Sequence, residues 1–303
     1  MPYNCVVLVK QVPDTKEISG KVMKDDGTVN RAALPAIFNP EDLNALELAL
    51  QIKDKYGGTV TAVTMGLPTA ANVLRESLFR GADDVVLITD RRCAASDTLA
   101  TSYILSCAVK KLAYDIVLCG RQAIDGDTAQ VGPQLAEKLG IPQISYVEAL
   151  NDLEDKVLTV RRSIGNGHQI VRCELPVLLT VLDTANEPRV NAAKHMMRHK
   201  KALSPFEIQQ KAKTELPNAN DAALAAKAQE ITDTLTKTNS VVKQWNLNDI
   251  EADLTWCGVS GSPTKVNRIQ SVVLAAKEIR EVEPTEEGVT DLIHELIQDN
   301  TIA

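Results

Sequence analysis

The stretch VTAVTMGLPTAANVLRESLFRGADDVVLIT (residues 60–89) carries the pattern that decides the fold. Its two ends, Val60–Thr64 and Val85–Thr89, are short runs rich in β-branched residues, which favour strands. Apolar residues between them have the spacing of one helical face: Val73, Leu74 and Leu78. A strand, a helix and a second strand in this order predict a βαβ unit with parallel strands.

The same alternation extends to both sides of this stretch. Cys5–Val9 and Asp115–Leu118 favour two more strands. Two further helices are indicated by apolar residues at helical spacing: Leu43, Leu46 and Leu50, then Ile104, Ala108 and Leu112. Gly81 and Gly140 stand where helices would end. The first half of the chain therefore predicts an α/β fold with a mostly parallel sheet.

The pattern changes from about Ile144 onward. Val157–Arg161 and His168–Arg172 alternate around a glycine-containing turn at 165–167, which predicts antiparallel or edge strands. A last strand is expected over Val177–Leu182. Residues 205–240 are polar and rich in Ala and Lys, and we expect a solvated or partner-facing helix there.

The C-terminal segment, residues 284–303, predicts an amphipathic helix that needs a surface to pack against. Its apolar face would hold Val289, Leu292, Ile293, Leu296 and Ile297.

Composition limits the classes of function. A chain of 303 residues with 44% hydrophobic content can build one large α/β domain with extra elements, or two small domains. The net charge of -7 argues against nucleic acid or an anionic membrane as the main partner. No apolar run approaches the ~20 residues that cross a bilayer. With no leader pattern at the N-terminus, we expect a cytoplasmic protein without membrane insertion.

Metal and nucleophile patterns are weak in this sequence. The six cysteines are far apart and form no C-x-x-C, so we expect reduced, buried thiols and neither a zinc site nor an iron–sulfur cluster. His195 and His199 have i,i+4 spacing but lie in a basic segment without a carboxylate ligand. The nucleophile elbow, the Walker A sequence and the G-x-G-x-x-G fingerprint are all missing from the sequence. We therefore nominate no metal ligand and no catalytic residue.

The segment LCGRQAIDGDTAQVGP (residues 118–133) follows a predicted strand and carries the strongest sign of chemistry. In parallel α/β sheets, ligands bind at the carboxyl ends of strands. Asp127 or Thr128 is expected to cap a helix that starts near Ala129, and a free helix N-terminus binds phosphate. A capped turn in an ordinary loop is the alternative. The pattern argues against a calcium loop, since the twelfth position from Asp125, where the ligand Glu would stand, is Ala136.

Three other segments have the signature of a helix start. Asn39–Asp42 combines an N-cap Asn, a Pro at N1 and two acids in the first turn, which alone indicates a structural role. Residues 64–68 contain Gly66, which allows either close approach of a ligand or a plain turn. Residues 96–102 offer four hydroxyls, of which capping explains one or two.

Several of these segments, in order, resemble the β subunit of electron transfer flavoproteins. They are residues 9–15 (VKQVPDT), the Asn39–Pro40 helix start, residues 63–66 (VTMG) and the Gln122–Pro133 loop. Residues 186–189 (NEPR) with the basic stretch after them are similar to the partner-recognition loop of that family. Residues 261–264 (GSPT) recur near its C-terminal arm. The resemblance covers roughly residues 1–203 and 241–303.

The resemblance implies a three-layer, mostly parallel Rossmann-like sheet of the adenine nucleotide-binding type with a C-terminal arm. It implies a nucleotide-binding domain over 1–203, a helical insertion over 204–240, and an arm over 241–303 that packs on an α subunit carrying its own FAD. The β subunit's own pocket holds AMP or a second FAD. By position, the contacting residues would be Leu8, Asn39, Pro40, Glu41, Asp42, Met65, Gly66, Asp97, Thr98, Thr101, Gln122, Ala123, Ile124, Asp125, Gly126, Asp127, Thr128, Ala129, Gln130, Val131 and Gly132.

The 122–133 loop together with residues 97–102 is similar to the electron-bifurcating subgroup. In that subgroup a β-bound FAD takes hydride from NADH. One electron goes to a low-potential carrier such as ferredoxin or flavodoxin, and one goes through the α-subunit FAD to an acyl-CoA dehydrogenase. Two alternatives stay open: a conventional β subunit with structural AMP, and a nucleotide-binding regulatory module without redox function.

Two further positions affect the interpretation. We expect the charge of Arg162, on the strand before the Gly165 turn, either to stabilise a reduced flavin or to tie subunits together; its alternative role is that of a surface strand residue. Ala193 stands where relatives often have a large aliphatic anchor, which leaves the choice of dehydrogenase open.

Overall fold

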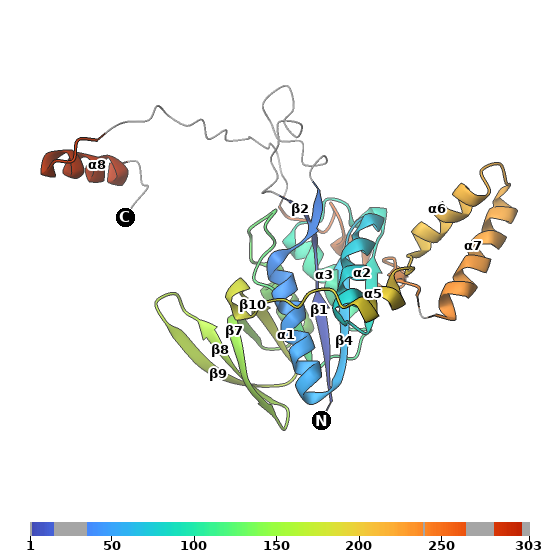
Figure 1. Ribbon diagram of the computed structural model, residues 1–303, viewed down its shortest axis with the longest axis horizontal. Coiled ribbons are helices and arrows are strands. Elements are labelled where there is room, and N and C mark those ends of the chain that lie inside the picture. Colours follow the sequence, from blue (N-terminus) through green and yellow to red (C-terminus); the bar gives the residue numbers. More distant parts are fainter. Residues whose placement is uncertain (1, 15–34, 239, 265–281, 299–303) are drawn as a thin grey trace. The chain divides into compact units, whose positions relative to one another are not determined.

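The computed structural model describes residues 2–14, 35–238, 240–264 and 282–298. Its main unit, Met1–Ile18 with Arg31–Asn267, is built on a nine-stranded sheet with the strand order β11-β5-β4-β1-β6-β10-β7-β8-β9 (Figure 1). The strands are β1 (Tyr3–Leu8), β4 (Gly58–Met65), β5 (Asp84–Ile88), β6 (Ile116–Gly120), β7 (Gln143–Glu154), β8 (Val157–Ser163), β9 (His168–Glu174), β10 (Val177–Val181) and β11 (Lys243–Trp245).

The helices of this unit lie between and after the strands. They are α1 (Pro40–Tyr56), α2 (Ala71–Arg80), α3 (Thr98–Val109), α4 (Val131–Leu139), α5 (Ala193–His199), α6 (Pro205–Glu215) and α7 (Asp221–Thr236). Short 3-10 turns are η3 (Pro68–Ala70), η4 (Arg91–Cys93), η5 (Asp183–Ala185) and η6 (Leu254–Trp256).

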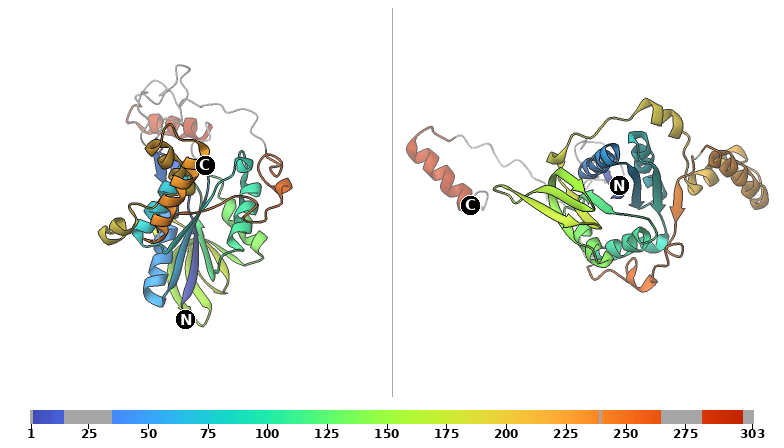
Figure 2. Two further views of the ribbon diagram at one scale, coloured as in Figure 1. Left: turned by 90° about the vertical axis from the view of Figure 1, so that its right-hand side faces the viewer. Right: turned by 90° about the horizontal axis from the view of Figure 1, so that it is seen from below.

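Helices cover both faces of the parallel part of the sheet, which makes three layers (Figure 2). On one face, Leu46 of α1 packs in a cluster with Val7 of β1. On the other face, Ile104 of α3 packs in a cluster with the adjacent strand residue Val6. Successive residues of β1 are thus buried on opposite faces, as in interior parallel strands. The predicted three-layer α/β fold is confirmed.

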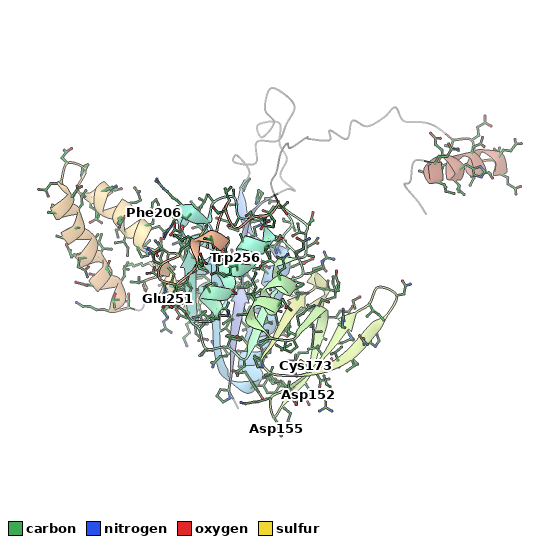
Figure 3. All side chains as sticks on the ribbon, turned by 180° about the vertical axis from the view of Figure 1, so that it is seen from behind. Asp152, Asp155, Cys173, Phe206, Glu251 and Trp256 are labelled. Atoms are coloured by element: carbon green, nitrogen blue, oxygen red, sulfur yellow. The ribbon has the colours of Figure 1, made fainter. Side chains whose placement is uncertain are left out.

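The antiparallel part of the sheet forms where the alternating pattern predicted it. Strands β8 and β9 pair antiparallel around the turn at 164–167, with Val160 opposite Val171, and β9 is an edge strand. Asp152 of β7, Asp155 of the β7–β8 turn and Cys173 of β9 lie close to one end of the antiparallel strands (Figure 3). The β10 strand is buried between β6 and β7 and runs parallel to both.

Four strands were absent from the sequence-based expectation. The long strand β7 pairs parallel with β10 and antiparallel with β8, and register shifts interrupt both ladders. Tyr146 within it has a φ of 59°, which breaks the period-two pattern that predicts a strand. The strand β11 follows β10, so Val177–Leu182 is not the last strand. The short pair β2 (Gln11–Pro13) and β3 (Ala36–Phe38) forms a separate antiparallel ribbon.

The predicted helical segment after residue 204 forms two helices, α6 and α7, which lie side by side (Figure 1). Ser204 caps α6 in a capping box with Glu207, whose carboxylate also pairs with Arg75 of α2 at 2.8 Å. Only Leu235 of α7 is buried, so this helix is solvated in the chain as predicted. Whether residues 204–240 are an insertion stays a prediction.

The second unit comprises Ser19–Asn30 and Arg268–Ala303, and its described residues are 282–298. They form α8 (Glu286–Gln298), which confirms the predicted C-terminal helix. Among the described helices, none combines the length and apolar character that crossing a bilayer requires.

Candidate functional site

The order of the strands fixes where a ligand can bind. From β1 the chain continues to β4 and β5 on one side, and it then crosses to β6, which pairs with the other edge of β1. The segments that leave the carboxyl ends of β1 and β6 therefore diverge, and a crevice opens at such a switch point. The predicted 122–133 loop begins directly after β6, at this point.

The carboxylate of Asp42 joins the two diverging strands. Its Oδ1 accepts a hydrogen bond from the Gly120 amide at 2.9 Å, and its Oδ2 accepts one from the Lys10 amide at 2.9 Å. Asp42 is buried at 6% exposure, and its bond with the Gly120 amide is buried, so that amide has no water as a substitute partner. One side chain in the first turn of α1 thus fixes the ends of both β1 and β6.

Two neighbouring side chains continue this contact along the loop. Glu41 accepts from the Gln122 amide at 2.8 Å and pairs with Arg121 at 2.7 Å. Asn39 accepts from the Ile124 amide at 3.2 Å and donates to the Gln122 carbonyl at 2.9 Å. We call Asn39, Glu41 and Asp42 the clamp, because they bind the amides of every second residue from 120 to 124.

The clamp corrects the expected roles of its members. Asn39 occupies the N-cap position of α1 with Pro40 at N1, as predicted, but its side chain makes no capping bond to that helix. It is fully buried against the loop instead. The side chains of Asn39, Glu41 and Asp42 therefore shape the loop that would hold a nucleotide, and their polar atoms are already engaged.

Burial changes the acidity of the clamp. Burial raises the pKa of the Asp42 carboxyl to about 7, although hydrogen bonds from the amides of Gly120 and Lys10 act in the opposite direction. Burial also raises the pKa of Glu41, against the effects of the Gln122 amide and of Arg121. The favourable field at the N-terminus of α1 opposes this cost of desolvation.

Sequence reasoning missed Lys10 and Arg121 as part of this site. Lys10 Nζ lies 2.8 Å from Asp125 Oδ1 and so ties the segment after β1 to the middle of the loop. Arg121 pairs with the clamp through Glu41. The signal was available for both, since each is a cationic residue directly after a buried strand.

The exposed half of the loop has the backbone of an anion site. Asp127 and Ala129 are left-handed, with φ of 47° and 52°, and Gln130 after Ala129 is right-handed at φ −99°. Consecutive left- and right-handed residues point their amides into one concavity, which binds anions. Among the described residues, the amides of 128–130 have no hydrogen-bond partner. These amides are therefore available to an anion.

The helix after the loop starts later than predicted. The α4 helix begins at Val131, and its N-cap is Gln130, which makes no side-chain capping bond. The expected capping by Asp127 or Thr128 is therefore wrong, because Asp127 accepts from the side chain of Gln122 at 2.9 Å instead. The N-terminal amides of α4 stay next to the concavity.

Three glycines of this region have different surroundings. A Cβ on Gly120 would lie 2.7 Å from Asp42 Oδ1, so the clamp requires glycine there. A Cβ on Gly132 would lie 2.9 Å from Cys119 Sγ and from Thr180 Cγ2, so its role is packing of α4 on the sheet. A Cβ on Gly126 would meet nothing within 4 Å. Only Gly126 has open space for a ligand beside it.

The α3 helix brings the 97–102 segment to the same corner. Asp97 caps α3 by accepting from the amides of Leu99 and Ala100, as the helix-start signature predicted. Its other oxygen accepts from the Thr264 amide at 3.0 Å, so its carboxylate is already occupied. Thr98 Oγ1 donates to Gln130 Oε1 at 2.8 Å, which joins the starts of α3 and α4.

The remaining predicted residues lie at the carboxyl ends of neighbouring strands. Leu8 ends β1 and is buried, and Met65 ends β4. Gly66 donates its amide to Ile88 at the end of β5. Thr101 is in the first turn of α3 and half-buried. These residues share the edge of the sheet with the loop, and their contact with a nucleotide stays a prediction.

The predicted recognition segment is bound to α1. Asn186 and Asn44 exchange hydrogen bonds, and Arg189 pairs with the buried Glu47 at 2.7 Å and with Asp54 at 2.9 Å. The docking role of this segment stays a prediction.

The cysteines and histidines carry no sign of a reactive site. All six cysteines are free, and burial raises the pKa of Cys5 to about 12 and that of Cys93 to about 12. His199 is buried, and that burial lowers its pKa. Within the described residues, no three potential ligands gather as a metal site.

Comparison with known proteins settles the family. A model of the electron transfer flavoprotein domain matches residues 26–223. The electron transfer flavoprotein subunit beta of Clostridium acetobutylicum is 42% identical over 265 residues, which cover 88% of this chain and 86% of that protein. The chain belongs to the electron transfer flavoprotein family. The resemblance to its β subunits is thereby confirmed, and such subunits work together with an α subunit.

Two other relatives in the electron transfer flavoprotein family carry names of reductase complexes. The acryloyl-CoA reductase electron transfer subunit gamma of Anaerotignum propionicum is 53% identical over 188 residues, 60% of this chain and 69% of that protein. A subunit of the caffeyl-CoA reductase–Etf complex of Acetobacterium woodii is 48% identical over 186 residues, 61% of this chain and 70% of that protein.

Proposed function

We propose that this electron transfer flavoprotein β subunit binds FAD at the β1–β6 switch point and works in electron bifurcation. FAD, when bound, would supply the redox chemistry there, with NADH as hydride donor and onward transfer of single electrons. One electron would go to a low-potential carrier, ferredoxin or flavodoxin. The other would go through the FAD of the α subunit to an acyl-CoA dehydrogenase. The names of the two reductase-complex relatives support this direction.

The observation that carries the proposal is the loop held by the clamp. Asn39, Glu41 and Asp42 fix residues 120–124, while the amides of 128–130 stay available for an anion. The protein's own part is therefore to bind the phosphates with backbone amides and to hold their position. No side chain of the site is assigned proton transfer.

The remaining predicted contacts belong to the same proposal. Leu8, Met65 and Gly66 would border the nucleotide from β1 and β4, and Thr98 and Thr101 from α3. Residues 1–203 would be the nucleotide-binding domain, 204–240 a helical insertion, and 241–303 an arm that packs on the α subunit. We further propose that the complex works in the cytoplasm.

A nucleotide count tests the choice of cofactor. We would purify the chain with its α subunit, release the nucleotides by denaturation, and quantify FAD and AMP by chromatography. Two FAD and no AMP per heterodimer support the proposal. One FAD and one AMP would contradict the proposal and indicate a conventional subunit with a structural nucleotide. A monomer that binds AMP or ATP without flavin would indicate a regulatory module.

A pair of glycine variants tests the position of the site. Gly126→Trp should remove the β-bound nucleotide and keep the α flavin, because the new side chain enters the open space beside the loop. Gly167→Trp is the matched control, since a Cβ there also meets nothing within 4 Å, and Gly167 lies in the β8–β9 turn, outside the predicted nucleotide contacts. If Gly126→Trp keeps both nucleotides, the nucleotide does not bind at this loop.

A further inference from the structure

A cavity lined by two arginines lies beside the β1–β6 switch point. It has a volume of about 420 Å³ and is lined by Arg121, Tyr146, Arg162, Ser163, Ile164, Gly165 and Leu182. We call it the arginine hollow. It shares no residue with the predicted nucleotide set, and it is formed by the ends of four neighbouring strands, β6, β10, β7 and β8.

The charge of Arg162 is uncompensated. Its Nη2 donates to the neutral hydroxyl of Ser145 at 3.0 Å, and no described carboxylate lies within ion-pair distance of it. The neighbouring Arg161 does have an acid partner, Glu148, at 3.2 Å. Of these two adjacent arginines, Arg161 has an acidic partner, and Arg162, which lines the hollow, has none among the described residues.

Both arginines of the hollow also have a buried Nε donor without an acceptor in the described part of the chain. The Nε atoms of Arg121 and Arg162 are both buried, and neither has a hydrogen-bond partner among the described residues. A buried donor without an acceptor is unfavourable. Both arginines line the same hollow, so an anionic group bound in it would neutralise the charge of Arg162 and offer an acceptor to the two guanidinium groups.

The volume of the hollow and its apolar lining indicate what kind of molecule could carry the anionic group. About 420 Å³ lies within the range of small-molecule sites, roughly 300–1,000 Å³, and exceeds what an inorganic anion fills. Leu182 and Ile164 supply apolar wall, and Ile164 is 60% exposed in the free chain. Tyr146 supplies an aromatic ring and is held in a left-handed backbone conformation, at φ 59°.

We propose that the arginine hollow binds a small organic anion. Arg162 and Arg121 donate to its carboxylate or phosphate oxygens, and Leu182, Ile164 and the ring of Tyr146 contact its apolar or aromatic body. The hollow contains none of the residues predicted to contact the nucleotide, and it borders that site through Arg121, which pairs with Glu41 of the clamp.

The test uses phenyl phosphate as the probe and the full-length chain in complex with its α subunit. Selective ¹⁵N labelling of arginine makes the Nε–H resonances visible, and calorimetry gives the affinity. We expect phenyl phosphate to shift the Nε–H resonances of Arg121 and Arg162 and to bind at least about tenfold more weakly to Arg162→Gln, because a charge-assisted hydrogen bond is lost. Inorganic phosphate should bind more weakly than phenyl phosphate.

Matched variants make the result decisive. Arg161→Gln, on the same strand, should bind as wild type does. Arg162→Lys should bind more weakly, since it keeps the charge but lacks the fork of the guanidinium. Gly126→Trp should leave the affinity for phenyl phosphate unchanged, which separates this site from the nucleotide site.

Several outcomes would overturn the proposal. They are Nε–H resonances that do not move, equal loss of affinity in Arg161→Gln and Arg162→Gln, and equal affinity for inorganic phosphate and phenyl phosphate. Weaker association of the two subunits in Arg162→Gln, with no anion binding to wild type, would assign the arginine to the subunit interface instead.

Discussion

The helices α1 and α3 begin with the same kind of sequence and use it in opposite ways. At α3, Asp97 accepts from the amides of Leu99 and Ala100 and so caps its own helix. At α1, Asn39 makes no capping bond and clamps the loop after β6. The difference follows burial: Asn39 is fully buried against that loop, and Asp97 is half-buried at the surface. A cap signature therefore shows where a helix starts, and the surroundings decide which amides the side chain binds.

The largest effect is expected at Asp42. Asp42→Ala leaves the buried amide of Gly120 and the partly buried amide of Lys10 without their acceptor, so the free energy of unfolding should fall by about 2–5 kcal/mol. Urea unfolding of wild type and variant measures the difference. A loss below about 1 kcal/mol would mean that the clamp is no stronger than an ordinary cap.

The substitution Asn39→Asp distinguishes a residue of the clamp from a helix cap. Asn and Asp are equivalent N-caps, so a true cap tolerates Asn39→Asp. In the clamp, this change removes the donor to the Gln122 carbonyl and buries a charge beside Glu41 and Asp42. We expect a loss of about 2–4 kcal/mol in the free energy of unfolding, because buried unpaired groups are unfavourable. An unchanged midpoint of thermal unfolding would contradict the clamp.

The pH dependence of stability should come from α1 and not from α3. The folded-state pKa of Asp42 is about 7, above its ordinary value of 3.8, so the folded protein binds this proton more tightly than the unfolded chain. The contribution of Asp42 is therefore most favourable below the ordinary value and declines as the pH rises to about 7. Urea unfolding between pH 5 and pH 8 should show this decline in wild type and a smaller decline in Asp42→Asn, where the raised pKa of Glu41 still contributes.

Asp97 should titrate in the opposite sense. Although burial opposes it, hydrogen bonds from Ala100, Thr264 and Leu99 lower the pKa of Asp97. Its stabilisation is thus present above the ordinary pKa of an aspartate and is lost only as the pH falls through the lowered value.

The smallest effect is expected for the exchange at α3. Asp97→Asn keeps an oxygen for the amides of Leu99 and Ala100 and weakens the bond from Thr264, so the loss should stay within about 1 kcal/mol. The same unfolding assay measures it. A larger loss than that of Asn39→Asp would reverse the comparison.

Periodicity was sufficient to predict the parallel core. The four predicted parallel strands and three helices all form, because their apolar residues face fixed layers on both sides of the sheet. The β7 strand was not predicted because Tyr146 and two register shifts interrupt its alternation. The β11 strand has three residues, too few to show a period.

The sequence pointed to the segments of the candidate site but not to their contacts with each other. The resemblance implies that the 122–132 loop and the Asn39–Asp42 start contact a nucleotide, and that stays a prediction. That the side chains of Asn39, Glu41 and Asp42 bind the loop itself depends on α1 lying against β6, a tertiary contact without a local sequence signal. The ion pair of Lys10 with Asp125 spans 115 positions for the same reason.

The two outer strands of the sheet bear on self-association. An outer strand offers a row of unpaired amides and carbonyls, onto which another copy can add a strand and so begin aggregation. At one end, β11 has only three residues, and its Lys243 pairs with Asp84. At the other end, β9 alternates apolar residues with His168, Arg172 and Glu174. A short strand at one side and charged side chains at the other make both ends of the described sheet poor templates for amyloid-like growth.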